Sequence, residues 1–485
     1  MVFSSPIFVF LFLPVVLTVS LLLPGVKARN LWLLLMSLVF YAWAQIDFIP
    51  LLLASTLVNY GLGLWLDRSE GAANRKCIVA LAVFINIGLL AFFKYANFTV
   101  GLFDSSLGLA GITPIKVPHI VLPIGISFFT FHALSYIIDV YRRKWRSATD
   151  PKDVALYIFF FPQLIAGPIL RWSSIGPQLR QRTVSRDVFA EGVRRFVGGL
   201  AKKMLIANSV AAPADQIFAL SASELSTPDA WFGILCYTLQ IYFDFSGYSD
   251  MAVGLGKMFG FEFLENFNFP YLAQSLRDFW RRWHISLTTW FRDYLYIPLG
   301  GNRISPGRTY LNLITVFFLC GLWHGASLTF VVWGLYHGFF LALERTRWGM
   351  WLAKLPRSLR HLYTILVVMM GWVLFRANSF TAAGHFFRAL LGLSAVPAFT
   401  ATSGGYDMTN FDVWAVILGI LFSGPLWNWM LTLFAKLGQM SPRASRPAVQ
   451  ALGSALEIVL IGALMLIISI SLAGNTYNPF IYFRF

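Results

Sequence analysis

The chain has 485 residues, of which 57% are hydrophobic, 17% aromatic and only 12% charged. Charged residues make up about a quarter of an ordinary soluble protein, so this composition excludes a soluble globular fold and favours a bilayer. The formal net charge is +16, but the Lys and Arg residues cluster between apolar runs. In a polytopic membrane protein that pattern is an orientation signal, so we expect no nucleic-acid binding.

Long apolar runs recur along the chain, and a helix needs roughly 20 apolar residues to cross a bilayer. The runs cover residues 6–24, 31–44, 48–66, 77–93, 120–138, 231–242, 310–341, 362–375, 413–434 and 455–472. The first run has neither a basic start nor a small-residue cleavage site, so we interpret it as a retained helix. The sequence predicts an all-α, polytopic membrane bundle that forms one domain over residues 1–485.

The three cysteines, Cys77, Cys236 and Cys320, lie inside or at the edges of apolar runs and include no CxxC pair. They therefore predict neither a disulfide framework nor a zinc site. We expect no metal and no permanently bound cofactor.

The segment "KDVALYIFFFPQLIAGPILRW" (152–172) is long enough to span, yet basic clusters flank it on both sides. Both of its ends should then be cytoplasmic. Pro162, Gly167 and Pro168 interrupt it around Gln163, and prolines break helical hydrogen bonding. We predict a re-entrant or broken segment, which indicates an internal cavity open toward the cytoplasm.

The block that follows, residues 171–220, has apolar residues at helical spacing between basic positions. This spacing predicts an amphipathic surface helix. Two interpretations stay open. The helix anchors to anionic lipid, or its basic residues, with Arg171 at the start, flank the entrance for an anionic donor.

The stretch "LRDFWRRWHISLTTWFRDYLYIPLGGNR" (276–303) contains five arginines and one histidine. On a helical wheel its aromatic residues share one face, while Arg281 and Arg282 lie on the polar face. That arrangement predicts an interfacial helix with His284 at the border between the faces. Taken alone, His284 is more simply a structural residue.

A second histidine lies inside the uncharged run "FFLCGLWHGASLTFVVWGLYHGFF" (317–340). An ionisable residue at membrane depth indicates function by default, so we single out His324 over His337. Gly321 and Gly325 would allow a close approach by another helix or a substrate. A buried neutral imidazole accepts protons, which suits a general base. The alternative is a histidine that only packs helices together.

A third group lies in "LQIYFDFSGYSDMAVGLGKMFG" (239–260), where Asp244 shares a helical face with Tyr248. A carboxylate at this depth needs a partner. It would orient an imidazole or bind hydroxyls, or else mark a polar kink in the helix. His132 and Ser135, in another aromatic run, are better explained as structural residues.

Three motifs together resemble the membrane-bound O-acyltransferase family, in particular its bacterial alginate O-acetyltransferase branch. They are "FWRRWHISLTTWFRDYLYIPLGG" (279–301), "GLWHG" (321–325) and "YFDFSGYSDMA" (242–252). The resemblance implies a helix bundle around a tunnel through the inner membrane. It also implies that His324, next to Trp323, is catalytic and that His284 is the second member of the site.

The resemblance further implies an acyl group taken from a cytoplasmic thioester, here acetyl-CoA, and moved toward an acceptor outside. Periplasmic partner proteins would complete its transfer to a polysaccharide such as alginate. Arg171, Arg281 and Arg282 would attract the donor's phosphates. Two alternatives stay open: acetylation of another surface polymer such as cellulose, and a transporter in which His324 and Asp244 relay protons.

Overall fold

The computed structural model describes residues 1–109, 118–394, 396, 406, 408–426, 429, 432, 446–474 and 480–481. Within these residues the regular structure is helical, with no strand, as the sequence predicts. The last part of the predicted run 413–434 lies outside the described residues. The helices up to residue 141 are η1 (Phe8–Phe12), α1 (Leu13–Leu22), α2 (Gly25–Gln45), η2 (Ile46–Phe48), α3 (Ile49–Arg68), α4 (Ala72–Leu109) and α5 (Ile126–Tyr141).

The later helices lie between residues 151 and 473. In the middle of the chain they are α6 (Pro151–Phe159), α7 (Phe161–Leu164), α8 (Trp172–Arg180), α9 (Arg186–Ala201), η3 (Lys202–Ala207), α10 (Asn208–Ala219), α11 (Thr227–Met258), η4 (Pro270–Leu272), α12 (Leu276–Arg282) and α13 (Ile285–Phe291). They continue with η5 (Arg292–Tyr296), α14 (Pro306–His324), α15 (Leu328–Leu343), α16 (Arg347–Lys354), α17 (Arg357–Arg376), α18 (Phe380–Leu390), α19 (Asn410–Phe422) and α21 (Arg446–Ala473).

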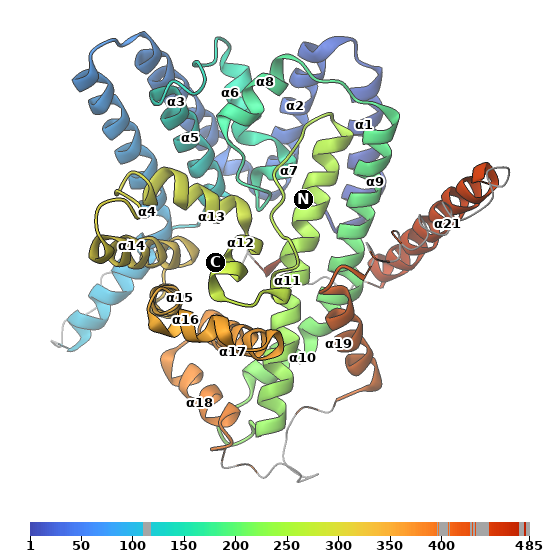
Figure 1. Ribbon diagram of the computed structural model, residues 1–485. Coiled ribbons are helices and arrows are strands. Elements are labelled where there is room, and N and C mark those ends of the chain that lie inside the picture. The colour runs from blue at the N-terminus through green and yellow to red at the C-terminus, as the bar shows by residue number, and fades with distance from the viewer. Residues whose placement is uncertain are drawn as a thin grey trace.

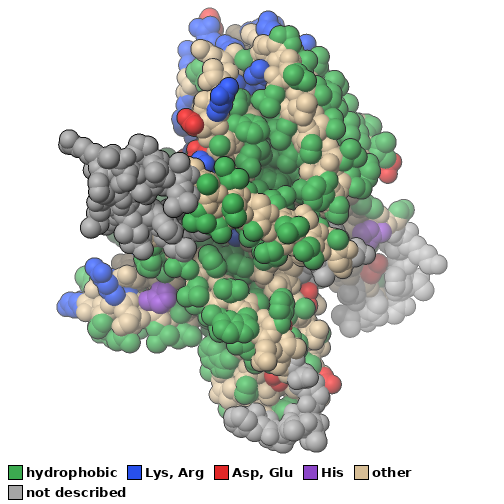
Figure 2. Space-filling model, turned by 90° about the vertical axis from the view of Figure 1, so that its right-hand side faces the viewer, with side chains coloured by type: hydrophobic (Ala, Val, Ile, Leu, Met, Phe, Trp, Pro, Cys, Tyr) green, Lys and Arg blue, Asp and Glu red, His purple; other side chains and the backbone are tan. Residues whose placement is uncertain are grey.

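Among the described residues, four helical stretches are long and apolar enough to cross a membrane: Gly25–Arg68, Ala72–Asp104, Arg357–Arg376 and Gly453–Ala473. Shorter apolar helices accompany them at Phe8–Leu22, Ile126–Tyr141, Leu328–Leu343 and Asn410–Phe422. Figure 2 shows a broad hydrophobic flank with Lys and Arg gathered toward its upper end. This surface suits a protein embedded in lipid with one basic end in water.

Helix α11 runs through the centre of the molecule, and nearly all of its side chains from Ala230 to Met258 are buried (Figure 1). Helix α9 lies against it at backbone distance. A Cβ at Gly199 would lie 2.6 Å from the Gly247 carbonyl oxygen, and one at Gly247 would lie 2.7 Å from the Gly199 oxygen. Small residues permit this close crossing. The predicted amphipathic helix in this block is α9, which exposes one face and packs its other face on α11.

The segment 152–172 is broken, as predicted. Helix α6 ends at Phe159, α7 occupies only one turn, and the chain then returns to α8, which lies beside α6 (Figure 1). Tyr157 Oη in α6 donates to the Leu170 carbonyl oxygen at 3.0 Å, which ties the two limbs together. Gly125 meets this turn with φ +75°, and a Cβ there would lie 2.5 Å from the Leu164 carbonyl oxygen, so the contact requires glycine.

The stretch 276–303 is not one interfacial helix. Helix α12 ends at Arg282, and α13 begins at Ile285 after His284, which has a left-handed φ of 41°. Most aromatic side chains of this stretch are buried against the rest of the protein. Ser286, a polar residue of the same stretch, is also fully buried. The helical-wheel prediction was wrong because it assumed an unbroken helix, and the break rotates α13 relative to α12.

The run 317–340 is likewise broken, since α14 ends at His324 and α15 begins at Leu328. The two helices form a tight pair. A Cβ at Gly321 would lie 2.4 Å from the Phe330 carbonyl oxygen. The predicted close approach at Gly321 is thus confirmed, and its partner is α15. His324 occupies the end of a helix and not the interior of a span.

Candidate active site

His324 lies in an aromatic box at the carboxyl end of α14. Its side chain is 4% exposed. Its ring centroid lies 5.0 Å from that of Trp323, 4.9 Å from that of Trp333 in α15 and 5.2 Å from that of Phe375 in α17. All three contacts are edge-to-face, which is a favoured geometry for aromatic pairs. These rings fix the imidazole and keep bulk water from it.

His284 lies on another side of the same tryptophan. Its ring centroid is 6.3 Å from that of Trp323 and 4.6 Å from that of Phe245 in α11. Its Nδ1 is 3.1 Å from Oδ1 of Asn266, which belongs to the segment between α11 and α12. The structure therefore brings three predicted residues together, His284, Trp323 and His324.

Helix α4 adds an amino group at this place. Lys94 Nζ donates to the Trp323 carbonyl oxygen and also lies 5.8 Å from the centroid of the Trp323 ring. The neighbouring Tyr95 Oη donates to the Leu322 carbonyl oxygen. The last carbonyl groups of a helix have no partner within it, and a cation is favoured there by the helix dipole. Lys94 and Tyr95 thus cap the end of α14 that carries His324.

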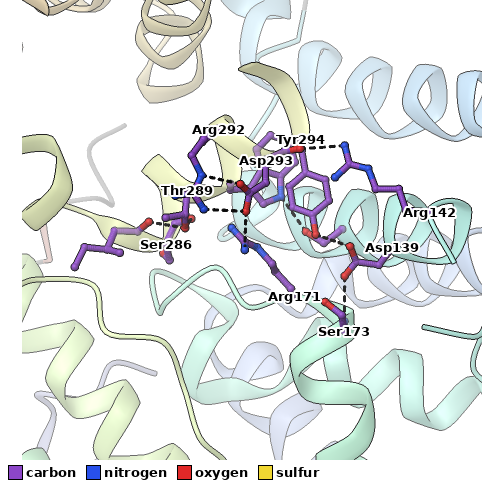
Figure 3. Close-up of polar contacts among 12 residues, drawn as sticks. Asp139, Arg142, Arg171, Ser173, Ser286, Thr289, Arg292, Asp293 and Tyr294 are labelled. Atoms are coloured by element: carbon purple, nitrogen blue, oxygen red, sulfur yellow. Dashed lines mark hydrogen bonds and ion pairs between the residues drawn. The ribbon is translucent and has the colours of Figure 1, made fainter. Parts of the chain in front are cut away.

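Arg171 belongs to a separate basic cluster. Figure 3 shows its guanidinium at the carboxylate of Asp293, with an NH1–Oδ2 distance of 2.8 Å. Arg292 Nε binds the other carboxylate oxygen at 2.7 Å, and Arg142 donates to the Asp293 carbonyl oxygen at 3.0 Å. Both Arg142 and Arg171 also lie over the ring of Tyr294, at 5.2 and 5.6 Å.

This cluster, Arg142, Arg171 and Arg292, holds three cations around one carboxylate. Partial burial alone would raise the Asp293 pKa, but the hydrogen bond from Arg292 and the charge of Arg171 outweigh burial and hold that pKa below its usual value. Asp293 is therefore an anion at neutral pH. The cluster keeps an excess of positive charge, which can bind a further anion.

The broken segment 152–172 and the start of α8 are anchored beside this cluster. Tyr294 Oη donates to Asp139 Oδ1 at 2.8 Å, and the Ser173 backbone N–H donates to Asp139 Oδ2 at 3.0 Å (Figure 3). His132 Nε2 lies 3.3 Å from the Leu170 backbone nitrogen, and Ser135 Oγ accepts from Trp290 Nε1 at 2.9 Å. His132 and Ser135 therefore hold structural positions, as the sequence favours.

The other arginines predicted to attract the donor lie on α12. Arg281 is exposed. Arg282 pairs with Asp278 one turn earlier at 3.0 Å and donates to the Asn268 carbonyl oxygen at 3.3 Å. Gln163 is buried in α7, where its amide donates to the Tyr157 carbonyl oxygen. The bonds of Arg282 and Gln163 are local contacts that shape their own segments.

Asp244 and Tyr248 lie on α11 near Phe245, which contacts His284. Asp244 forms a buried ion pair with Lys203 at 2.8 Å and accepts from the Ile481 backbone N–H at 2.7 Å. Tyr248 is stacked between Phe3 and Phe480, each with its ring centroid 4.6 Å away. A cavity of about 10 Å³ remains there, enough for about one water. Asp244 thus neutralises a buried lysine, and it bonds to Lys203 and to the Ile481 backbone instead of orienting an imidazole.

Sequence reasoning missed Lys94, Asn266 and the partners of Arg171. Lys94 carried a usable signal, because it is a charged residue within the apolar segment "LLAFFKYANF". Asn266 and Asp293 carried none, since their roles depend on contacts between distant segments.

The chain belongs to the membrane-bound O-acyltransferase family, whose sequence profile matches residues 35–383. It is thus a multi-pass membrane enzyme that transfers acyl groups. It is 50% identical over 395 residues to a probable alginate O-acetylase of Azotobacter vinelandii, covering 80% of this chain and 78% of the relative. It is 42% identical over 500 residues to the protein of the same description in Pseudomonas putida, over the full length of both. A peptidoglycan O-acetyltransferase of Helicobacter pylori is 37% identical, covering 82% of this chain and 81% of the relative.

Proposed function

We propose that this enzyme takes an acetyl group from acetyl-CoA at the cytoplasmic face and transfers it toward hydroxyl groups of an exopolysaccharide. The observation that carries this proposal is the meeting of His284 and His324 on one indole ring, Trp323, at breaks in two segments of the family region. Where a helix is interrupted, some backbone groups lose their hydrogen-bond partners within the helix. Space also opens there that continuous, packed helices do not have. Imidazoles at such breaks suit proton transfer to a hydroxyl substrate.

In this proposal His324 is the general base. It accepts the proton of the acceptor hydroxyl while the hydroxyl oxygen attacks the thioester carbonyl carbon. A C–O bond forms, and the carbonyl oxygen becomes an oxyanion. When the oxyanion collapses, the C–S bond breaks and the leaving thiolate takes the proton from the imidazolium. The aromatic box around His324 excludes water and so limits hydrolysis of the thioester.

Donor binding is assigned to the basic cluster of Arg142, Arg171 and Arg292, whose charge exceeds that of Asp293. The donor's phosphates are strong acceptors for guanidinium groups. Arg281 and Arg282 add to the positive field from α12 and remain predictions as donor-attracting residues. A tunnel through residues 1–485, acting as one domain, would join this entrance to the two histidines.

The acceptor is proposed from the relatives, which are named for alginate and for peptidoglycan. An alginate-like exopolysaccharide is favoured because the alginate relatives are the more similar of these, and a cellulose-like polymer is the alternative. The basic end of the molecule supports an orientation with that end in the cytoplasm, and we propose that the enzyme lies in a bacterial inner membrane. Periplasmic partner proteins would then complete the transfer to the polymer.

The test is a strain that carries His324→Ala at matched protein level, with His385→Ala as the control, because His385 is an exposed histidine on α18. The acetyl content of the secreted polymer is measured after alkaline release of acetate. We expect acetylation to disappear with His324→Ala and to stay normal with His385→Ala. Normal acetylation with His324→Ala would reject the assignment of His324.

A further inference from the structure

Asn266 makes a set of contacts with the break between α12 and α13. Its side chain is 1% exposed. Its Oδ1 accepts from the Ser286 backbone N–H at 3.1 Å and lies 3.1 Å from Nδ1 of His284. Its carbonyl oxygen accepts from the Ile285 backbone N–H at 2.9 Å. One asparagine thus contacts three successive residues at the point where the chain turns.

These contacts determine which ring nitrogen of His284 carries a proton. A backbone N–H only donates, so the amide atom that faces the Ser286 nitrogen is the oxygen and not the nitrogen of the Asn266 side chain. An amide oxygen only accepts. His284 Nδ1, which shares that oxygen, must therefore be the donor and carry the proton. In the neutral ring Nε2 is then unprotonated and has the lone pair.

The backbone at His284 also depends on these contacts. His284 has a φ of 41°, a conformation that is costly for a residue with a side chain. Such strain persists only where neighbouring structure holds it. The two backbone donors that follow, Ile285 and Ser286, are both bound by Asn266. In addition, Ser286 Oγ accepts from the Ile169 backbone N–H at 2.9 Å, which links the turn to the broken segment 152–172.

We propose that Asn266 is a positioning residue that holds His284 as its Nδ1–H tautomer, so that Nε2 is a proton acceptor next to Trp323 and His324. This inference rests on the proposed acyl transfer. It makes His284 a second base of the site, and it gives the buried side chain of Asn266 a role there. Phe245, Trp323 and Asn266, which pack on His284, carry no titratable group, whereas the titratable residues His324 and Lys94 contact the same Trp323.

The first test compares Asn266→Leu and Asn266→Asp in purified full-length protein, by initial rates of acetyl-CoA cleavage across pH. Leucine removes the acceptor for Nδ1, so we expect kcat to fall by about 100-fold, as for loss of a correctly oriented base, with little change in the donor's KM. Aspartate keeps an acceptor but adds a charge that favours the imidazolium, so we expect activity to persist with its acidic limb moved up by about one pH unit or more.

Asn268 provides the matched control, because it lies in the same segment and its side chain is exposed. Asn268→Leu and Asn268→Asp should leave kcat and the pH profile unchanged. A purely structural role for Asn266 predicts that both of its variants lose activity in proportion to lost folded protein, without a shift of the acidic limb. That result, or unchanged kinetics in both variants, would overturn the proposal.

A second measurement does not depend on activity. In protein labelled with 15N-histidine, the His284 resonances are identified by their absence from the His284→Gln spectrum. We expect wild-type His284 to be protonated at Nδ1 and unprotonated at Nε2. Protonation at Nε2 instead would refute the inference even if Asn266→Leu fails to fold. If the tautomer is as expected while the wild-type protein cleaves no acetyl-CoA, the proposed function fails and the tautomer assigned to His284 stands.

Discussion

The contact between α14 and α15 gives a sharp prediction at Gly321, three residues before His324. A Cβ at this position would lie 2.4 Å from the Phe330 carbonyl oxygen. An ordinary contact begins near 3.4 Å, so Gly321→Ala must move the two helices apart by about 3.4 − 2.4 = 1.0 Å. A misplacement of about 1 Å at a reacting group can cost about 100-fold in rate.

The assay is thiol release from acetyl-CoA by purified protein, with saturation curves to separate kcat from KM. We expect Gly321→Ala to lower kcat by about 100-fold, and overpacking to destabilise the protein by about 1–3 kcal/mol. Gly88→Ala in α4 is the control, because no atom lies within 4 Å of a Cβ there. It should keep full activity, and alanine in place of a helical glycine should stabilise by roughly 1 kcal/mol. Normal turnover in Gly321→Ala would refute the argument that this contact positions His324.

Two further predictions concern charges. Lys94→Met leaves the buried Trp323 carbonyl oxygen without its donor, which costs about 2 kcal/mol, so kcat should fall by up to about 30-fold. Lys76→Met, at an exposed position of the same helix, should have no effect. Equal kcat in both variants would contradict the capping role. For Asp293, whose folded-state pKa is lowered, the ionised carboxylate stabilises the fold above the unfolded pKa of about 3.9. That stabilisation is lost as pH falls through the lowered pKa. Asp293→Asn should therefore lower the Tm at neutral pH and match wild type in strong acid, and a constant difference in Tm at all pH values would contradict this.

Composition and hydropathy were enough to predict the helical membrane bundle, because burial in lipid demands long apolar runs and satisfied backbone groups. The broken segment 152–172 was predictable as well, since Pro162, Gly167 and Pro168 are local signals. The breaks at His284 and after His324 were not. His284 adopts a left-handed backbone that its own side chain disfavours, and contacts from distant segments, those of Asn266 among them, hold it there.

The candidate site was predictable in part for the same reason. His324 is conspicuous because an ionisable group in an apolar run is rare, whatever its contacts are. Asp244 is conspicuous by the same rule, yet it pairs with Lys203, a residue 41 positions away whose approach follows from the α9–α11 glycine contact. Sequence alone identifies the residues that need partners, whereas the crossing of distant helices decides which partners they have.

The central claim is that His324 catalyses acyl transfer from a thioester. Its most direct test is the full-length protein in lipid nanodiscs with acetyl-CoA labelled in the acetyl group, comparing wild type, His324→Ala and His385→Ala. We expect wild type and His385→Ala to release free thiol and to pass the label to an added polysaccharide or periplasmic extract, and His324→Ala to do neither. Thiol release and label transfer by folded His324→Ala at the wild-type rate would contradict the claim.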